Sequence, residues 1–221
     1  MNKDQQGYSI IITVYDQERE IAENLPSFLT QTYEPGYEVI VVDESSTDET
    51  TDTLKLIKND HPHLYTTFLP RPNRLESRPR MAYSIGVKAA RHEWVIIANI
   101  NKKPAAPDIL HAIAEATDRE TQLILGYNGR KGTRLQPFTD CQDASRLLEK
   151  AERKKGKLHD TRRMKYLKGK YDFIVVRKDV AHDALKYFDE HVGRIRRFSL
   201  GHAIFWYNLM HRSSTTLLVT E

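Results

Sequence analysis

Apolar and polar positions alternate between two patterns over the first 127 residues. Continuous, mostly β-branched runs are typical of parallel strands buried on both faces; these are YSIIITV (8–14), YEVIVVDE (37–44) and WVIIANI (94–100). A weaker strand, LYTTFL (64–69), and a fifth, TQLILGY (121–127), fit the same series. Between them, apolar residues recur at helical spacing. This alternation predicts an α/β fold with a mostly parallel, doubly wound sheet and helices on both faces.

Local signals predict where three of the helices begin or break. Pro26 interrupts the apolar face of the first helix and should kink or restart it. Ser46 and Glu49 have the spacing of a capping box, which predicts a helix start in SSTDETT. Pro107 should lie in the first turn of the helix PDILHAIAEATD. The segment RMAYSIGVKAARH (80–92) supplies a further helix.

The second half of the chain, residues 128–221, has a less regular pattern. It predicts a strand YDFIVVR, a helix DVAHDALKYFDEH, a helix GHAIFWYNLMHR and a last strand TTLLVTE. No internal repeat and no Gly/Ser linker divides the chain. At 221 residues it is within reach of one domain. We therefore expect a single domain, 1–221, in which the second half elaborates the sheet.

Composition narrows the cellular setting more than the function. The chain is 39% hydrophobic and 29% charged, with a net charge of +4. Cys141 is the only cysteine, so an intrachain disulfide is impossible and a reducing compartment is favoured. No apolar run reaches the ~20 residues that span a bilayer. We expect a cytoplasmic protein, either peripheral at the inner face of a membrane or anchored by a segment outside this sequence.

Polar side chains gather where the first, second and fourth strands end. They are Thr13, Tyr15, Asp43, Glu44, Asn99 and Asn101, and the segment before the helix at 80–92 adds Arg74, Arg78 and Arg80. Ligands of doubly wound sheets bind outside the carboxyl ends of the strands. A ring can stack on a base, carboxylates can accept from base N–H or ribose hydroxyl groups, and arginines can hold phosphates. No glycine-rich phosphate loop is present. A nucleotide site and ordinary polar loops both remain open interpretations.

The stretch SIIITVYDQEREIAENLPSFLTQTYEPGYEVIVVDESSTDET resembles the opening of family-2 glycosyltransferases with the GT-A fold. The shared features are a strand ending in a Thr-x-Tyr turn, a helix ending in Leu-x-Gln-Thr-Tyr, and a strand ending in Val-Asp followed by Ser-x-Asp. The resemblance spans about residues 8–127. It implies a nucleotide-binding half (1–127), an acceptor-side half (128–221), and transfer from a UDP- or GDP-linked sugar to a saccharide or lipid-linked acceptor in surface polysaccharide or glycan synthesis.

The resemblance also implies roles for the strand-end residues. Thr13 and Tyr15 would flank the base, and Asp43 or Glu44 would accept its N–H or the ribose hydroxyls. The basic group near the diphosphate would come from Arg74, Arg78 and Arg80. The family's D-x-D motif, which normally binds Mg²⁺ or Mn²⁺, falls on Asn99-Ile100-Asn101. The family's catalytic carboxylate falls within SLGHAIFWYN, which has none.

The loss of these carboxylates changes the expected cofactor. An amide oxygen is a neutral metal ligand, and Lys102 and Lys103 add positive charge beside it. Divalent-cation affinity should therefore fall, so no cofactor is firmly expected although the family uses Mg or Mn. Three alternatives stay open. The lysines replace the cation with His202 as base; the protein is an inactive relative that binds nucleotide or a partner as a scaffold; or metal-dependent transfer uses Asn101 and other ligands.

A basic segment, residues 146–170, holds eleven Lys/Arg against three Asp/Glu. It reads as a solvated helix and loop, or as a patch that faces an anionic membrane surface. Nucleic acid is not expected as a partner, because the strand ends are acidic and no nucleic-acid motif is present.

Overall fold

The computed structural model describes residues 6–69, 78–117, 121–128, 172–191 and 214–220. Its centre is a seven-stranded sheet in the order β3-β2-β1-β4-β6-β5-β7. The strands are β1 (Tyr8–Val14), β2 (Tyr37–Asp43), β3 (Leu64–Phe68), β4 (Trp94–Ala98), β5 (Thr121–Asn128), β6 (Phe173–Arg177) and β7 (Ser214–Thr220). Only β6 runs antiparallel to its neighbours among these strands. The predicted mostly parallel sheet is confirmed.

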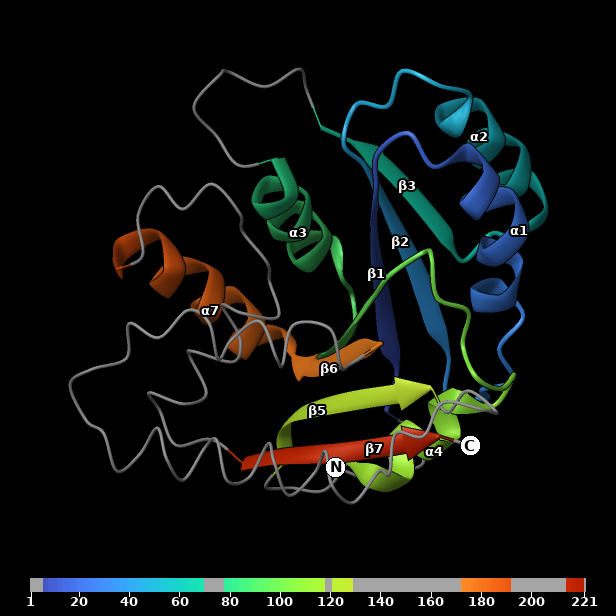
Figure 1. The fold of residues 1–221 in the computed structure, drawn as a ribbon. Coiled ribbons are helices and arrows are strands. Elements are labelled where there is room, and N and C mark those ends of the chain that lie inside the picture. Colours follow the sequence, from blue (N-terminus) through green and yellow to red (C-terminus); the bar gives the residue numbers. More distant parts are fainter. Residues whose placement is uncertain (1–5, 70–77, 118–120, 129–171, 192–213, 221) are drawn as a thin grey trace, which may run out of the picture.

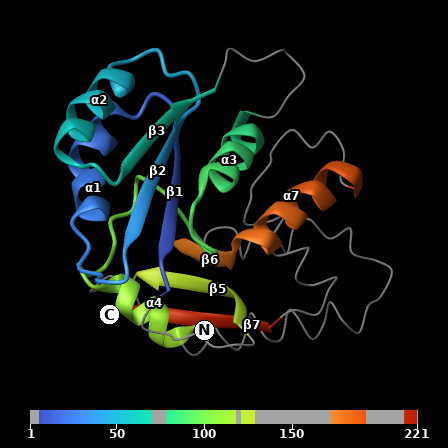
Figure 2. The same ribbon diagram turned by 180° about the vertical axis from the view of Figure 1, so that it is seen from behind.

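Helices cover both faces of the sheet (Figures 1 and 2). One face carries α1 (Glu18–Leu29), α2 (Thr50–Asp60) and α4 (Ile109–Ala116), and the other carries α3 (Arg78–Ala89) and α7 (Lys178–His191). Successive residues of a buried strand point to opposite faces. Accordingly, Ile10 and Ile12 of β1 join the core under α1, whereas Ile11 joins the core under α3 and α7.

The close approach of α3 to the sheet depends on Gly86. A Cβ at this position would lie 2.5 Å from the Cγ2 atom of Ile11, so any side chain there would push α3 away from β1. The lack of a side chain therefore sets the spacing of the layer that carries Arg78, Arg80 and Tyr83.

The helix α1 passes through Pro26 as a single element, so the expected restart at this proline is wrong. The carbonyl of Pro26 still accepts the backbone N–H of Thr30 at 3.0 Å. Leu25 and Phe28, on either side of the proline, are both buried in the same core. Their burial holds the two parts together as one continuous helix despite the missing proline N–H.

The start of α2 also differs from the sequence prediction. Ser46 donates both its backbone N–H and its hydroxyl to Oδ1 of Asp43, at 2.8 and 2.7 Å, so it forms no capping box with Glu49. Asp48 instead accepts the backbone N–H of Thr50, the first residue of the helix. The strand-end carboxylate of Asp43 competes successfully for Ser46.

The start of α4 lies two residues after Pro107, which is therefore outside the helix rather than in its first turn. The carbonyl of Pro107 accepts the backbone N–H of Thr32 at 2.8 Å, which ties this loop to the segment after α1.

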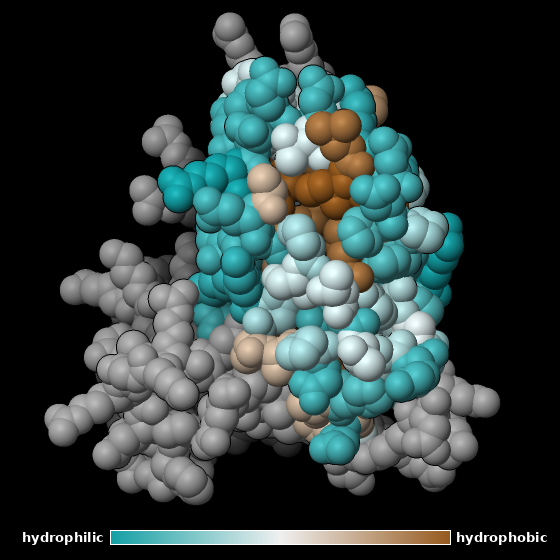
Figure 3. All heavy atoms as spheres, turned by 90° about the vertical axis from the view of Figure 1, so that its right-hand side faces the viewer, coloured by the Kyte–Doolittle hydropathy of each residue, from teal (hydrophilic) through white to brown (hydrophobic). Residues whose placement is uncertain are grey.

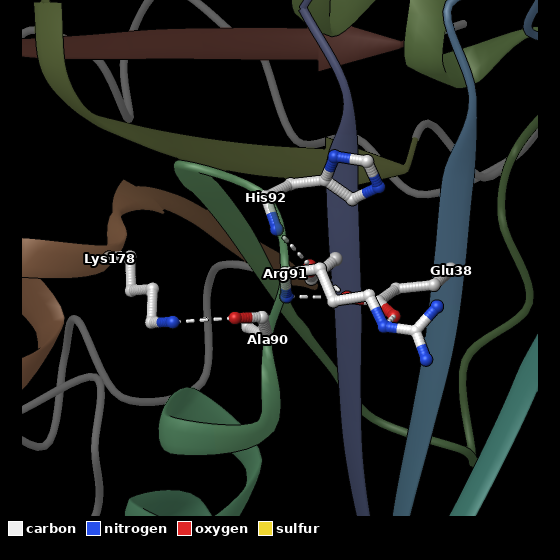
Figure 4. A network of polar contacts seen from close by, with 6 residues as sticks. Glu38, Ala90, Arg91, His92 and Lys178 are labelled. Atoms are coloured by element: carbon white, nitrogen blue, oxygen red, sulfur yellow. Dashed lines mark hydrogen bonds and ion pairs between the residues drawn. The ribbon is translucent and has the colours of Figure 1, made fainter.

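A buried carboxylate organises the amino edge of the sheet (Figure 4). Oε1 of Glu38 accepts the hydroxyl of Ser9 and the backbone N–H of Arg91, both at 2.7 Å. The hydroxyl of Ser9 in turn accepts the backbone N–H of His92 at 3.2 Å. Lys178, at the start of α7, donates to the carbonyl of Ala90. These bonds fix the turn between α3 and β4 at the edge opposite the strand ends described below.

The second half contributes strands to the same sheet, because β6 pairs with β4 and β7 pairs with β5. Cys141, the basic segment 146–170 and the helix expected at 201–212 lie outside the described residues. Within the described part of the chain, no helix is long and apolar enough to cross a membrane. The side formed by α1 and α2 is mostly hydrophilic apart from one hydrophobic patch (Figure 3).

Candidate functional site

The carboxyl ends of β2, β1 and β4 lie next to one another in the sheet. Val14 pairs with Asp43, and Ile12 pairs with Ala98, so the three strands end nearly level. The loops that follow carry Tyr15, Glu44, Asn99 and Asn101. Because β6 is antiparallel, its first residues also lie at this edge, where Phe173 pairs with Ala98. The strand-end residues predicted from the sequence are thus brought to one edge.

Side-chain hydrogen bonds join the loop after β1 to the loop after β2. Oδ1 of Asp16 accepts the backbone N–H of Thr47 at 2.6 Å, and the backbone N–H of Asp16 donates to the hydroxyl of Ser46 at 2.9 Å. Asp16 and Ser45 have φ of 48° and 64°, a left-handed conformation that short polar residues tolerate better than bulky ones. These bonds join the two loops into one rim at the carboxyl edge.

The side chain of Asp43 accepts hydrogen bonds from residues of this rim. Besides the two bonds from Ser46, its Oδ2 accepts the hydroxyl of Thr51 at 2.8 Å. The residue is only 4% exposed. With both oxygens engaged by the protein, Asp43 shapes the turn between β2 and α2.

Tyr83, on α3, lies near Thr13 and Glu44. Burial raises the pKa of Tyr83, a hydrogen bond with Thr13 opposes the rise, and the negative charge of Glu44 adds to it. The phenol therefore stays protonated at neutral pH. Tyr15, by contrast, is 43% exposed and presents its ring at the edge.

The amides after β4 bond to each other. Oδ1 of Asn99 accepts the backbone N–H of Asn101 at 2.9 Å and the Nδ2 of Asn101 at 3.0 Å. Oδ1 of Asn101 accepts Nε2 of Gln17 at 3.4 Å. Ile100 between them is buried, and its carbonyl accepts Nδ2 of Asn24 at 2.8 Å. The backbone under the two exposed amides is therefore held from inside the protein.

The two lysines that follow are both close to carboxylates. Lys102 forms an ion pair with Asp172, the residue before β6, and both side chains are partly buried. Lys103 is exposed and near α1. The Arg19 guanidinium holds the pKa of Glu23 below its usual range, and the charge of Lys103 adds a smaller lowering.

The described residues do not fit a divalent cation. No group of three or more His, Cys, Asp or Glu side chains that could hold a metal gathers anywhere within them. The Asn99 oxygen already accepts two hydrogen bonds, and Lys102 places a positive charge on the same loop. Hard cations need several oxygen ligands with at least some net negative charge. At positions 99 and 101 the loop after β4 supplies neutral amides instead.

Only some of the predicted basic and catalytic residues lie within the described part of the chain. Arg78 is the first residue of α3, and Arg80 follows in the first turn with a half-buried side chain. Since α3 leads into β4 at the amino edge, its first turn lies at the carboxyl edge. Arg74 and His202 lie outside the described residues, so their roles stay predictions.

The sequence interpretation missed three residues that the structure places at this edge: Gln17, Tyr83 and Asp172. Tyr83 lies three residues after Arg80, on the same helix face, so this spacing could have indicated that Tyr83 lies near the candidate site. Asp172 could be recognised only once β6 was known to be antiparallel, because a parallel strand would carry it to the opposite edge.

Comparisons with known proteins agree with this geometry. The sheet and its helices match the GT-A fold of solved glycosyltransferases. Residues 9–134 match the family model described as glycosyl transferase family 2. The chain belongs to this family. No curated protein matches the chain.

Three solved structures illustrate the likeness. The mannosyltransferase PcManGT from Pyrobaculum calidifontis, in complex with GDP-Man and Mn²⁺, is 17% identical with a TM-score of 0.60, over 96% of this chain and 56% of that one. TarS 1-349 from S. aureus is 20% identical with a TM-score of 0.62, over 97% and 58%. The 4-diphosphocytidyl-2C-methyl-D-erythritol synthase from Anaerococcus prevotii is 12% identical with a TM-score of 0.59, over 100% and 91%.

The chain thus spans less than two thirds of the length of the first two proteins. At these identities the likeness establishes the fold alone.

Proposed function

We propose that this protein binds a nucleotide sugar, UDP- or GDP-linked, and transfers the sugar to a saccharide or lipid-linked acceptor in surface polysaccharide or glycan synthesis. The observation that carries the proposal is the shared edge of β1, β2 and β4 in a family-2 glycosyltransferase chain, where an exposed tyrosine, a buried glutamate and the start of a basic helix meet. Mannosyltransferase PcManGT, whose structure contains GDP-Man, has the same fold.

Each group at the edge has a role in this proposal. Tyr15 stacks on the base, and Thr13 lies beside it. Glu44 accepts the base N–H or the ribose hydroxyls. Arg78 and Arg80, with Arg74, neutralise the diphosphate. Asn99 and Asn101 occupy the place of the family's D-x-D motif, so the leaving diphosphate meets amide and basic groups rather than a metal ion.

The acceptor belongs to the second half of the chain in this proposal. The basic segment 146–170 falls between β5 and β6, and β5 ends where β6 begins, at the carboxyl edge. Clustered Lys/Arg residues near anionic lipid gain about 1 kcal/mol each. A segment of this charge, placed in the sequence between two strands that meet at the carboxyl edge, is suited to bring a lipid-linked acceptor to the donor site at a membrane surface. His202 is the proposed base.

The test is donor turnover. The protein is incubated with UDP- and GDP-sugars in EDTA and in Mn²⁺, and release of UDP or GDP is measured, with Tyr15→Ala and Glu44→Gln as site variants. Release that both variants reduce supports the proposal. If wild-type protein binds neither nucleotide by calorimetry, the proposal is wrong.

An inactive homologue that acts as a binding or scaffold module is the second candidate function. The observation in its favour is that the described edge offers no carboxylate cluster for a metal. This alternative predicts nucleotide binding at the edge without release of product over hours, and unchanged binding when His202 is replaced by Ala. Turnover that requires His202 rejects it.

A further inference from the structure

A chain of side-chain amides runs along the carboxyl edge from β1 to β4, and a backbone N–H group fixes each end. At the β1 end, the N–H of Tyr15 donates to Oε1 of Gln17 at 3.4 Å. At the β4 end, the N–H of Asn101 donates to Oδ1 of Asn99 at 2.9 Å. Because a backbone N–H only donates, it determines which atom of each amide must face it.

The amides between these ends have one arrangement that satisfies both. Nε2 of Gln17 donates to Oδ1 of Asn101 at 3.4 Å, and Nδ2 of Asn101 donates to Oδ1 of Asn99 at 3.0 Å. Turning any one amide over would set oxygen against oxygen or nitrogen against nitrogen. The chain therefore runs in a single direction, and its terminal group is the Nδ2 of Asn99, an exposed hydrogen-bond donor at the ligand edge.

The direction of the hydrogen bonds along the amide chain decides what this edge can bind. With Asp at position 99, one oxygen could still accept the N–H of Asn101, but the outward atom would be an anionic oxygen that attracts a cation. With Asn, the outward atom is a donor that attracts an oxygen. The charge of Lys102 is already shared with Asp172, so the amide is a separate contribution from the lysines.

We propose that Nδ2 of Asn99 donates directly to a diphosphate oxygen of the bound nucleotide, at the place where a metal ion would otherwise bridge protein and diphosphate, and that Gln17 is the positioning residue that keeps this donor facing outward. The inference rests on the proposed function, since it assumes a nucleotide at this edge. It adds the direct amide contact and the role of Gln17, a residue that touches no ligand itself.

A matched set of substitutions can test this proposal. Asn99→Asp keeps the acceptor for Asn101 and exchanges only the outward donor for a carboxylate oxygen. Gln17→Glu removes the donor to Asn101 without changing size, and Gln17→Met removes polarity without adding charge. Gln6→Glu is the control, because Gln6 makes the same kind of bond, from Nε2 to the hydroxyl of Tyr8 at 2.9 Å, before β1 at the opposite edge.

Calorimetry in EDTA then compares uridine, UDP and UDP-GlcNAc, with guanosine and GDP as the parallel set. Asn99→Asp should weaken UDP by about tenfold or more, because a charge-assisted hydrogen bond is replaced by repulsion, and should leave uridine unchanged. Gln17→Glu should weaken UDP binding by about threefold to tenfold, the effect of one ordinary hydrogen bond. The affinity of Gln17→Met for UDP should lie between those of wild type and Gln17→Glu. Gln6→Glu should equal wild type.

The nucleoside arm separates the possible failures. A wild type that binds neither nucleosides nor nucleotides refutes the proposed function, and this inference with it. If UDP binds wild type and Asn99→Asp equally in EDTA, or if the variant loses uridine as much as UDP, only the donor role is refuted. If Asn99→Asp weakens UDP-GlcNAc but not UDP, the amide faces the sugar and the diphosphate contact is wrong. If Gln17→Glu and Gln6→Glu bind UDP with equal affinity, Gln17 has no positioning role.

Discussion

Lys102 and Asp172 form an ion pair that joins the loop after β4 to the start of β6. The two residues are 70 positions apart in the sequence, and the antiparallel pairing of β6 with β4 brings them together at the edge that carries the candidate site. The pair holds the loop of Asn99 and Asn101 against the second half of the chain.

Replacing one member of this pair should destabilise the fold. Lys102→Met leaves the Asp172 carboxylate, whose side chain is 19% exposed, without its cation. We expect a loss of about 1 kcal/mol in the free energy of unfolding, measured by urea titration. Lys102→Met with Asp172→Asn should recover part of it. Lys55→Met is the control, because the Lys55–Asp52 pair is mostly exposed and should contribute little. Equal losses at both lysines would contradict a specific role for the pair.

Nucleotide binding should be weak and nearly independent of Mn²⁺. The reason is the absence of carboxylates at positions 99 and 101, where the amide oxygen of Asn99 is already occupied by hydrogen bonds. The measurement is a UDP and GDP titration with and without Mn²⁺. A tightening of about tenfold, equal to about 1.4 kcal/mol, would mean that a metal site survives.

Two substitutions should restore a metal response. Asn99→Asp with Asn101→Asp changes charge but hardly changes shape, so strand packing should tolerate it. Two carboxylates at this edge should bind Mn²⁺ in the presence of UDP and raise the melting temperature. Neutralising Lys102 and Lys103 as well should strengthen the effect. At a free Mn²⁺ concentration a hundredfold above its Kd, binding should add about 2.7 kcal/mol to the free energy of unfolding. Folded variants without any metal response would show that these asparagines do not occupy the place of the D-x-D motif.

Asp48 caps two helices with one carboxylate, and its contribution should depend on pH. It accepts the backbone N–H of Glu18 at 3.2 Å and of Thr50 at 3.1 Å, the first residues of α1 and α2. Burial pushes the pKa of Asp48 up, but the hydrogen bonds at Thr50 and Glu18 outweigh it and lower the pKa below 3.8. A lowered folded-state pKa stabilises the protein above the unfolded pKa, and this part of the stability is lost as pH falls through the folded value.

Asp48→Ala should therefore cost about 1 kcal/mol at pH 7. Thermal melts of wild type and Asp48→Asn from pH 7 to pH 2.5 test the pH dependence. The two proteins should differ most near neutrality and converge at the acid end. A difference that stays constant over this range would exclude a charged cap.

The basic segment 146–170 should bind anionic vesicles in a salt-dependent way. Its eleven Lys/Arg residues motivate the expectation, and the Debye length of ~8 Å at physiological salt sets the screening. Sedimentation with neutral and with anionic vesicles is the measurement. Equal sedimentation with both would show that the segment is only a solvated face.

The fold was predictable because buried parallel strands leave a strong signal. The runs at 8–14, 37–44 and 94–100 are too apolar to be anything but central strands, and their order predicts the sheet. Helix starts were less predictable. The capping box at Ser46 failed because a carboxylate from the preceding strand competed for the serine, and the restart at Pro26 failed because the buried side chains around it kept the helix together.

The site was predictable to the level of the edge but not of its bonds. Tyr15, Glu44 and Asn99 each follow a strand end, and the structure brings these strand ends to one edge of the sheet. The direction of the amide chain could not be read from the sequence, because it depends on a contact between Gln17 and Asn101, 84 residues apart. The partner of Lys102 was equally hidden, since it depends on the antiparallel direction of β6.

That antiparallel direction also bears on how this protein can diversify. In the sequence, residues 129–171 connect β5 to β6, and these two strands are direct neighbours, with Gly126 paired to Phe173. The segment is therefore topologically a hairpin connection, whose ends meet whatever its length. The entropy cost of such a loop grows only slowly with length, by roughly 0.6 kcal/mol per doubling. Shortening, exchanging or grafting this excursion should leave strand order and donor edge intact, which makes it the natural place for specificity to evolve.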